Sequence, residues 1–103
     1  MNNQEKIEKA LSAIKSAYGT EDDEYGGTLF ISHHLEELSP EYWKKHTGKE
    51  TPNAEEIFNL FELQEAWEDG CTFDFTLPEE VTDYVVSVSF DENGKVEDIV
   101  MES

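Results

Sequence analysis

The residues of this chain that can do chemistry are mainly carboxylates, together with three histidines and one cysteine. Acidic residues number 25 against 7 basic residues, and every basic residue is a lysine. Glu79 and Glu80 are adjacent, and a pair of carboxylates in a cleft can act as general acid and general base. In so acidic a chain, such pairs arise from composition alone. We therefore predict no catalytic residues, and an enzyme using carboxylates, histidines and a metal ion is the less favoured alternative.

His33 and His34 are the first residues to consider as metal ligands. On a helix, adjacent side chains point about 100° apart, so the two imidazoles do not face one ion as an i, i+4 pair does. His46 and Cys71 lie far from them in the sequence, and Cys71 has no basic neighbour that would stabilise a thiolate. We predict no zinc site, no cofactor, and a thiol that is buried or inert.

Two acidic segments share ligand types with calcium sites. Residues 20–24 include four consecutive acids, and carboxylate clusters can hold Ca²⁺, but a segment without an apolar anchor is more simply a solvated loop. Residues 91–94 lack the D-x-[DN]-x-[DN]-G order of a calcium loop and are explained by a hairpin turn with a positive φ at Gly94.

Net charge is the most informative bulk property, with a formal value of −18. Residues 1–50 contain ten acids and six lysines, a net charge of −4, whereas residues 51–103 contain fifteen acids and one lysine, a net charge of −14. Such a chain repels nucleic acid and anionic lipid and attracts cationic partners. The competing explanation is that the acids only keep a small protein in solution.

The elements that position these residues begin with two predicted helices. Ile7, Leu11, Ile14 and Tyr18 are spaced by four, three and four residues and form one face of a helix over residues 3–18. Residues 29–38 also have apolar residues at helical spacing, which favours a helix there over a strand. Both helices need an apolar surface to cover, and a sheet is the simplest one.

Two further helices are indicated by their end signals. Serine is a preferred N-cap residue and proline is a preferred first residue of a helix, so Ser39 and Pro40 predict the start of a short helix. We expect this helix to end near Gly48. Asn53 and Glu56 have capping-box spacing and open a predicted helix over residues 54–67. The predicted buried stripe of that helix consists of Ile57, Leu60, Phe61, Gln64 and Trp67.

The last third of the chain has the period of two that is typical of strands. Apolar and polar residues alternate over residues 72–77 and 84–90, and residues 95–101 return after the turn at 91–94. The sequence therefore predicts a single α+β domain, residues 1–103, with three to four helices packed on one face of a C-terminal three-stranded antiparallel β-meander.

Targeting signals are not apparent in the sequence. The first residues lack the apolar core of a signal peptide, and no run approaches the roughly 20 apolar residues of a membrane span. A single cysteine suits a reducing compartment. We expect a cytoplasmic protein that is monomeric when unbound and has no membrane partner.

Three segments resemble a family of small bacterial proteins known only as a domain of unknown function. These segments are HHLEELSPEYWKKH at 33–46, FELQEAW at 61–67 and, most specifically, FDFTLPEEVTDYVVSVSFDENGKVEDIVMES at 73–103. Small acidic proteins of this type also resemble immunity proteins of contact-dependent growth-inhibition and other polymorphic toxin systems. The resemblance implies a protein that binds and blocks a toxin domain, and it supplies no catalytic residues.

We therefore expect a non-catalytic acidic binding protein whose partner is a basic, nuclease-type toxin domain. A structural or regulatory protein with no toxin connection is the alternative. The predicted partner-binding acids fall into two groups, one where the fourth helix leads into the first strand and one on the loops and edge of the meander. The first group is Glu65, Glu68, Asp69 and Asp74, and the second is Glu79, Glu80, Asp83, Asp91, Glu92, Glu97 and Asp98.

Overall fold

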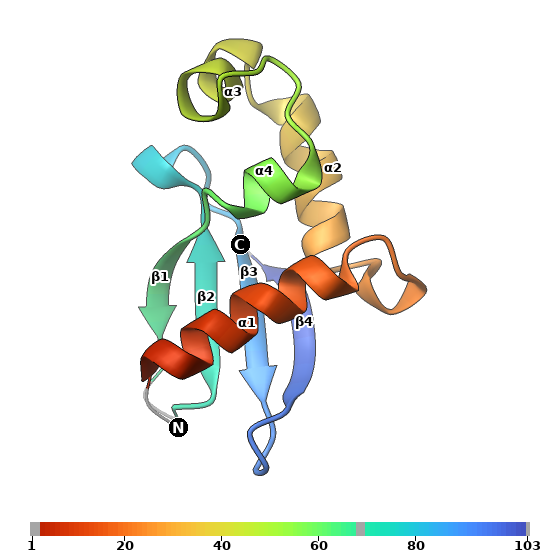
Figure 1. The fold of residues 1–103 in the computed structure, drawn as a ribbon, viewed down its shortest axis with the longest axis vertical. Helices are drawn as coiled ribbons and strands as arrows, with labels where there is room; N and C mark the ends of the chain where they lie inside the picture. The colour runs from red at the N-terminus through yellow and green to blue at the C-terminus, as the bar shows by residue number, and fades with distance from the viewer. Residues whose placement is uncertain (1–2, 68–69, 103) are drawn as a thin grey trace.

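The chain has an α+β fold, seen in a computed structural model that describes residues 3–67 and 70–102 (Figure 1). Helices fill the N-terminal half, and an antiparallel sheet fills the C-terminal part. The elements are α1 (Asn3–Ala17), the 3-10 turn η1 (Glu21–Asp23), α2 (Gly27–Glu37), α3 (Pro40–Thr47), α4 (Ala54–Phe58), β1 (Glu62–Ala66), β2 (Thr72–Thr76), the 3-10 turn η2 (Pro78–Glu80), β3 (Val85–Phe90) and β4 (Val96–Glu102).

The predicted helix starts and stops at α3 and α4 are confirmed. Ser39 caps α3 by accepting a hydrogen bond from the Tyr42 amide at 3.3 Å, and Gly48 ends this helix at a φ of 82°. Asn53 and Glu56 form a reciprocal capping box, with hydrogen bonds of 2.9 and 3.1 Å between each side chain and the other residue's amide. Each cap satisfies amides at a helix start that have no partner within the helix.

The predicted helix over residues 54–67 is wrong in its second half. It ends at Phe58, and Glu62–Ala66 form β1, which pairs antiparallel with β2. Ile57 and Phe61 are buried as predicted, but Gln64 and Trp67 are exposed. The cause is long-range pairing, because backbone hydrogen bonds to β2 replace the helical bonds that local sequence alone favours.

The sheet has four strands in the order β1-β2-β3-β4, so the predicted three-stranded meander is one strand short. The three predicted strands are present, and the predicted turn at 91–94 joins β3 to β4 with Gly94 at a φ of 78°. Asp91 Oδ1 accepts hydrogen bonds from the amides of Asn93 and Lys95 at 2.8 and 3.0 Å, which holds this turn.

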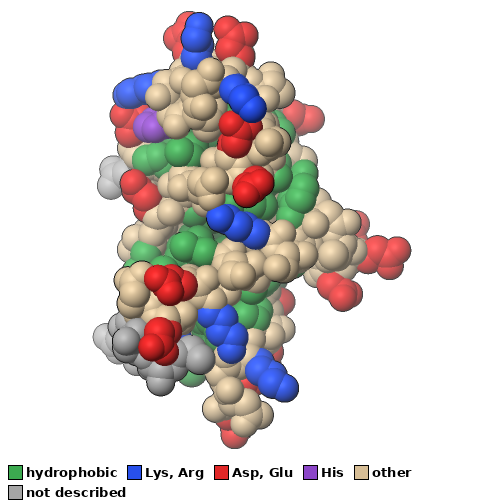
Figure 2. Space-filling view, in the orientation of Figure 1, with side chains coloured by type: hydrophobic (Ala, Val, Ile, Leu, Met, Phe, Trp, Pro, Cys, Tyr) green, Lys and Arg blue, Asp and Glu red, His purple; other side chains and the backbone are tan. Residues whose placement is uncertain are grey.

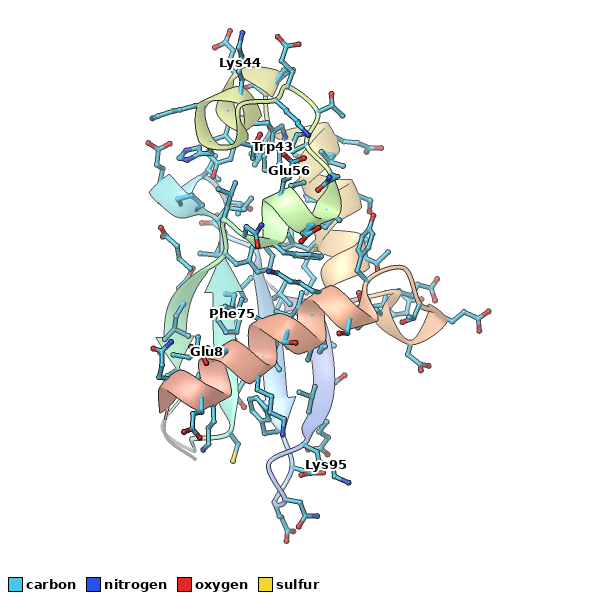
Figure 3. All side chains as sticks on the ribbon, in the orientation of Figure 1. Glu8, Trp43, Lys44, Glu56, Phe75 and Lys95 are labelled. Atoms are coloured by element: carbon cyan, nitrogen blue, oxygen red, sulfur yellow. The ribbon has the colours of Figure 1, made fainter. Side chains whose placement is uncertain are left out.

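The core lies between the helices and one face of the sheet. Phe73, Phe75, Val86 and Val88 are all 0% exposed, and they cluster with buried residues of α1, α2, α3 and α4. Figure 1 shows α1 crossing this face of the sheet, and Phe75 lies between β2 and α1 in Figure 3. The alternation predicted for β2 and β3 is therefore confirmed, because the apolar row of each strand packs against the helices.

The acidic segment at 20–24 differs from its prediction as a solvated loop. It forms η1, and Asp23 is 2% exposed. The Asp23 carboxylate accepts hydrogen bonds from Gly27 N, Thr28 N and Thr28 Oγ1 at 3.2, 2.9 and 2.8 Å. One of the four acids is therefore a structural residue that supports the start of α2.

Candidate functional site

The side of the sheet that faces away from the core is the candidate functional site. Cross-strand partners share a face, so the strand register identifies its side chains. We call this set the outer face. It comprises Glu62, Glu65, Thr72, Asp74, Thr76, Val85, Ser87, Ser89, Asp98, Val100 and Glu102.

Every charged residue among the outer-face positions is a carboxylate. Glu62, Glu65, Asp98 and Glu102 are exposed, Asp74 is buried between the strands, and none of the strand positions defined above is basic. Neighbouring carboxylates reinforce one another's potential, and strand pairing holds them on a rigid support. This arrangement can attract and bind a cationic surface.

Asp74 has the most unusual surroundings of these carboxylates. It is 8% exposed, and its Oδ2 atom accepts a hydrogen bond from Trp67 Nε1 at 3.0 Å. Its Oδ1 atom is buried without a hydrogen-bond partner among the residues that the structure describes. Glu65 lies directly opposite Asp74 across the β1–β2 pair, while the Trp67 side chain is 47% exposed. An aromatic ring and two carboxylates thus come together on the outer face.

The remaining predicted acids lie in several places. Glu79 and Asp83 are near η2, Asp91 and Glu92 are in the β3–β4 turn at the other end of β3, and Glu97 is exposed on β4. Among the predicted acids whose side chains the structure describes, Glu65, Asp74 and Asp98 are the ones that belong to the outer face. Glu68 and Asp69 lie outside the described residues, as does the side chain of Glu80.

A hollow of about 650 Å³ adjoins the outer face at the η2 end of the sheet. Its carboxylates are Glu62, Glu79 and Asp83. Glu79 has a φ of 68°, a left-handed conformation that non-glycine residues rarely adopt, and it contacts Lys45 Nζ at 2.6 Å and His46 Nε2 at 2.9 Å. Lys45 and then His46 lower the pKa of Glu79. Since this carboxylate already has a lysine and a histidine as partners within the chain, it is less available to a second protein.

The lysines lie on the helical side of the molecule. Lys6 and Lys9 of α1 donate hydrogen bonds to the carbonyls of Gly70 and Gly94, and Lys15 donates to Asn59 Oδ1 at 2.7 Å. Figure 2, viewed from this side, shows blue lysine side chains along the whole length of the molecule. Acidic side chains lie among these lysines on the same side in Figure 2, so this side has charges of both signs, whereas the outer-face positions include no lysine.

The histidines are held in protein contacts. His34 is 1% exposed, with Nδ1 2.7 Å from the Phe30 carbonyl and Nε2 2.8 Å from Thr82 Oγ1. Nδ1 therefore donates its proton to the carbonyl, and Nε2 accepts one from the hydroxyl. No group of three histidine, cysteine or acidic side chains within residues 3–67 and 70–102 is arranged to hold a metal ion.

Burial lowers the pKa of His34 below 6.5, the Phe30 carbonyl acts in the opposite direction, and nearby His33 lowers the pKa further while Glu37 raises it. Between pH 6.5 and the lowered pKa, the unfolded chain binds more protons than the folded chain, so the free energy of unfolding falls as the pH is lowered through this range. We expect the melting temperature of the wild type to drop from about pH 7.5 to about pH 5.5, and to drop less for His34→Gln.

Thermal melts followed by circular dichroism at the two pH values measure this difference. Glu56 and Glu79 have pKa values lowered from 4.5, so their titration lies below this window. Equal changes in melting temperature for the wild type and His34→Gln would show that this imidazole is not the group that titrates.

The fold and this surface define a small α+β protein with an acidic sheet face. Comparison with protein-family models, with curated proteins and with solved structures found no match to this chain. No helix in the described part of the chain is both long and apolar enough to cross a membrane. The functional argument therefore depends on the geometry and charge of the chain itself.

Sequence reasoning missed three residues of the candidate site. Trp67 was predicted to be buried in a helix, and Glu62 and Glu102 were not among the predicted binding acids. The short alternation of residues 61–66 is typical of a strand and could have indicated the positions of Glu62 and Trp67. The helix prediction, which was based on the capping box at Asn53, took precedence over it. Glu102 could have been found by extending the alternation of the last strand by one residue.

Proposed function

We propose that this protein is a non-catalytic, acidic binding protein of the immunity type, which binds and neutralises a basic nuclease-type toxin domain. The observation that supports this proposal is the outer face, where Glu62, Glu65, Asp74, Asp98 and Glu102 lie on one side of a sheet with no lysine among them. A partner with a cationic surface complements this face.

Enzymes that act on phosphodiesters need a cationic groove, because their substrate has a regular row of negative charges. A rigid set of carboxylates can occupy such a groove in place of the substrate backbone and block access to it. The proposed inhibitor needs no catalytic residue of its own, and it works where the nuclease would act, which we propose is the cytoplasm.

The lysines favour one orientation of binding. Those of α1 lie across the opposite side of the sheet, where Lys6 and Lys9 contact backbone carbonyls of the hairpin turns. A cationic partner is therefore attracted to the outer face and repelled by parts of the helical side. Such steering raises the association rate and makes it sensitive to salt.

Charge reversal tests this proposal with a basic nuclease-type toxin domain as the partner. We expect Glu62→Lys, Glu65→Lys and Glu102→Lys together to lower the association rate about tenfold or more at low salt. These residues are exposed, unlike Asp74, and they avoid Glu79, whose charge is already paired. Stopped-flow binding at about 0.05 M and about 0.2 M salt measures the rate.

The matched control reverses the same number of charges elsewhere, at Glu8, Glu21 and Glu50, which are exposed in α1, η1 and the segment before α4. Glu8 lies on α1 in Figure 3. We expect this control to change the rate by less than about threefold at the higher salt concentration, where distant charges are screened. If the association rate does not change with salt or with either triple reversal, the electrostatic proposal is wrong. The acidic residues then serve only to keep the protein in solution.

A further inference from the structure

We infer that the outer face binds an arginine side chain of a basic protein partner at a site formed by Trp67, Asp74 and Glu65. This inference rests on the proposed function and names the chemical group that the partner presents. We call the three residues the arginine site. It depends on contacts within the β1–β2 hairpin as well as on the charge of the whole face.

The first support is the incomplete hydrogen bonding of Asp74. Trp67 Nε1 occupies Oδ2 at 3.0 Å, whereas Oδ1 is buried and lacks a donor among the described residues. A buried carboxylate oxygen without a donor is unfavourable, so native structures rarely retain one without a reason. Because Oδ1 is buried, a cation bound at the surface acts on Asp74 through its charge rather than through a direct hydrogen bond to this oxygen.

The second support is the pairing of two carboxylates. Glu65 and Asp74 are Cα partners across β1 and β2, so their side chains stand next to each other on the outer face. Like charges directly opposite one another destabilise a sheet. No lysine is hydrogen bonded or ion paired to Glu65 or Asp74 in the described chain. A cation placed between the two carboxylates removes this repulsion.

The third support is Trp67, which is a large aromatic side chain at 47% exposure beside these carboxylates. Its ring offers a face on which a cation can stack. A guanidinium is planar, stacks on aromatic rings and donates several hydrogen bonds to carboxylates in a fixed geometry, whereas an ammonium is a compact and strongly hydrated charge. The combination of a ring with two carboxylates therefore selects arginine over lysine.

The test uses the full-length protein and two short synthetic peptides. One peptide alternates arginine with glycine, and the other has lysine in place of arginine at the same length and charge. Trp43 is 1% exposed, so a change in tryptophan fluorescence on adding peptide reports mainly on Trp67. We expect the arginine peptide to bind about fivefold more tightly than the lysine peptide, and to change the fluorescence.

Substitutions then identify the residues responsible. Glu65→Gln is expected to weaken binding of the arginine peptide about fivefold or more, and Asp74→Asn is expected to act in the same direction. Glu8→Gln removes an equal charge from α1 and is expected to weaken binding less than twofold. Trp67→Leu is expected to abolish most of the preference for arginine over lysine.

A stability measurement separates this site from a merely structural role. Because Glu65→Gln removes a repulsion with Asp74, we expect the free protein to melt about 2–4 °C higher although it binds the peptide less well. A structural role for Glu65 predicts a lower melting temperature instead.

Equal binding of the two peptides, or equal effects of Glu65→Gln and Glu8→Gln, overturns the arginine site. Either result leaves the proposed function standing if the toxin domain is still bound in a salt-dependent manner. Conversely, a toxin domain that does not bind overturns the proposed function even where the arginine peptide is preferred. The two failures are therefore distinguishable.

Discussion

Val88→Asp is expected to reduce the free energy of unfolding by on the order of 4 kcal/mol, which is enough to unfold a large fraction of a marginally stable domain. Val88 is 0% exposed and lies between Phe73 on β2 and Ile99 on β4. A carboxylate at this position enters the core without a cationic or hydrogen-bonding partner. The measurement is a urea melt of each variant, with the midpoint and slope both fitted.

Leu63→Asp is the matched control, because it introduces the same side chain at an apolar strand position. Leu63 is 40% exposed on β1, at the edge of the sheet, and we expect its replacement to change the free energy of unfolding by less than about 1 kcal/mol. Ser87 is a poor control although alternation places it on the outer face, since it is 5% exposed and opposite Asp74. Leu63 is the Cα partner of Phe75 and so belongs to the same side of the sheet as Val88, which means that the comparison isolates burial rather than face. Equal destabilisation by Val88→Asp and Leu63→Asp would contradict the burial of Val88.

Local signals predict those parts of the fold that local interactions decide. The capping residues Ser39, Asn53 and Glu56 act within a few positions of themselves, and each forms the predicted hydrogen bonds. Alternation in β2 and β3 likewise predicts which side chains are buried against the helices, because one face of the sheet is covered and the register is thereby fixed.

Features decided by distant contacts are not predictable in this way. The capping box at Asn53 specifies where α4 begins, but the end of α4 at Phe58 depends on pairing between β1 and β2. The same pairing turns Trp67 from a predicted core residue into an exposed one and places Glu65 opposite Asp74. The candidate site therefore depends on the part of the fold that sequence patterns describe least well.

The acids illustrate the same limit, because composition treats all 25 as equivalent and the structure does not. Asp23 supports the start of α2, Glu79 is paired with Lys45 and His46, and Asp91 holds a turn. These residues have roles within the chain. The exposed carboxylates of the outer face are the ones that the proposed function assigns to a partner.

Asp23→Ala is expected to lower the free energy of unfolding by about 3 kcal/mol, because it leaves buried donors at the start of α2 without an acceptor. The Asp23 carboxylate accepts hydrogen bonds from Gly27 N and Thr28 N at 3.2 and 2.9 Å. The space is also tight, since a Cβ on neighbouring Gly26 would lie 2.7 Å from the Ile99 carbonyl and closer still to Asp23 Oδ1.

Asp22→Ala is the matched control, because Asp22 is the exposed neighbour of Asp23 in the same 3-10 turn. We expect it to change the free energy of unfolding by no more than about 0.5 kcal/mol. Denaturant melts measure both variants, and amide hydrogen exchange at Gly27 and Thr28 should become faster in Asp23→Ala than in Asp22→Ala, since those amides lose their acceptor. Similar melts and similar exchange in the two variants would mean that η1 is the solvated acidic loop that its sequence predicts.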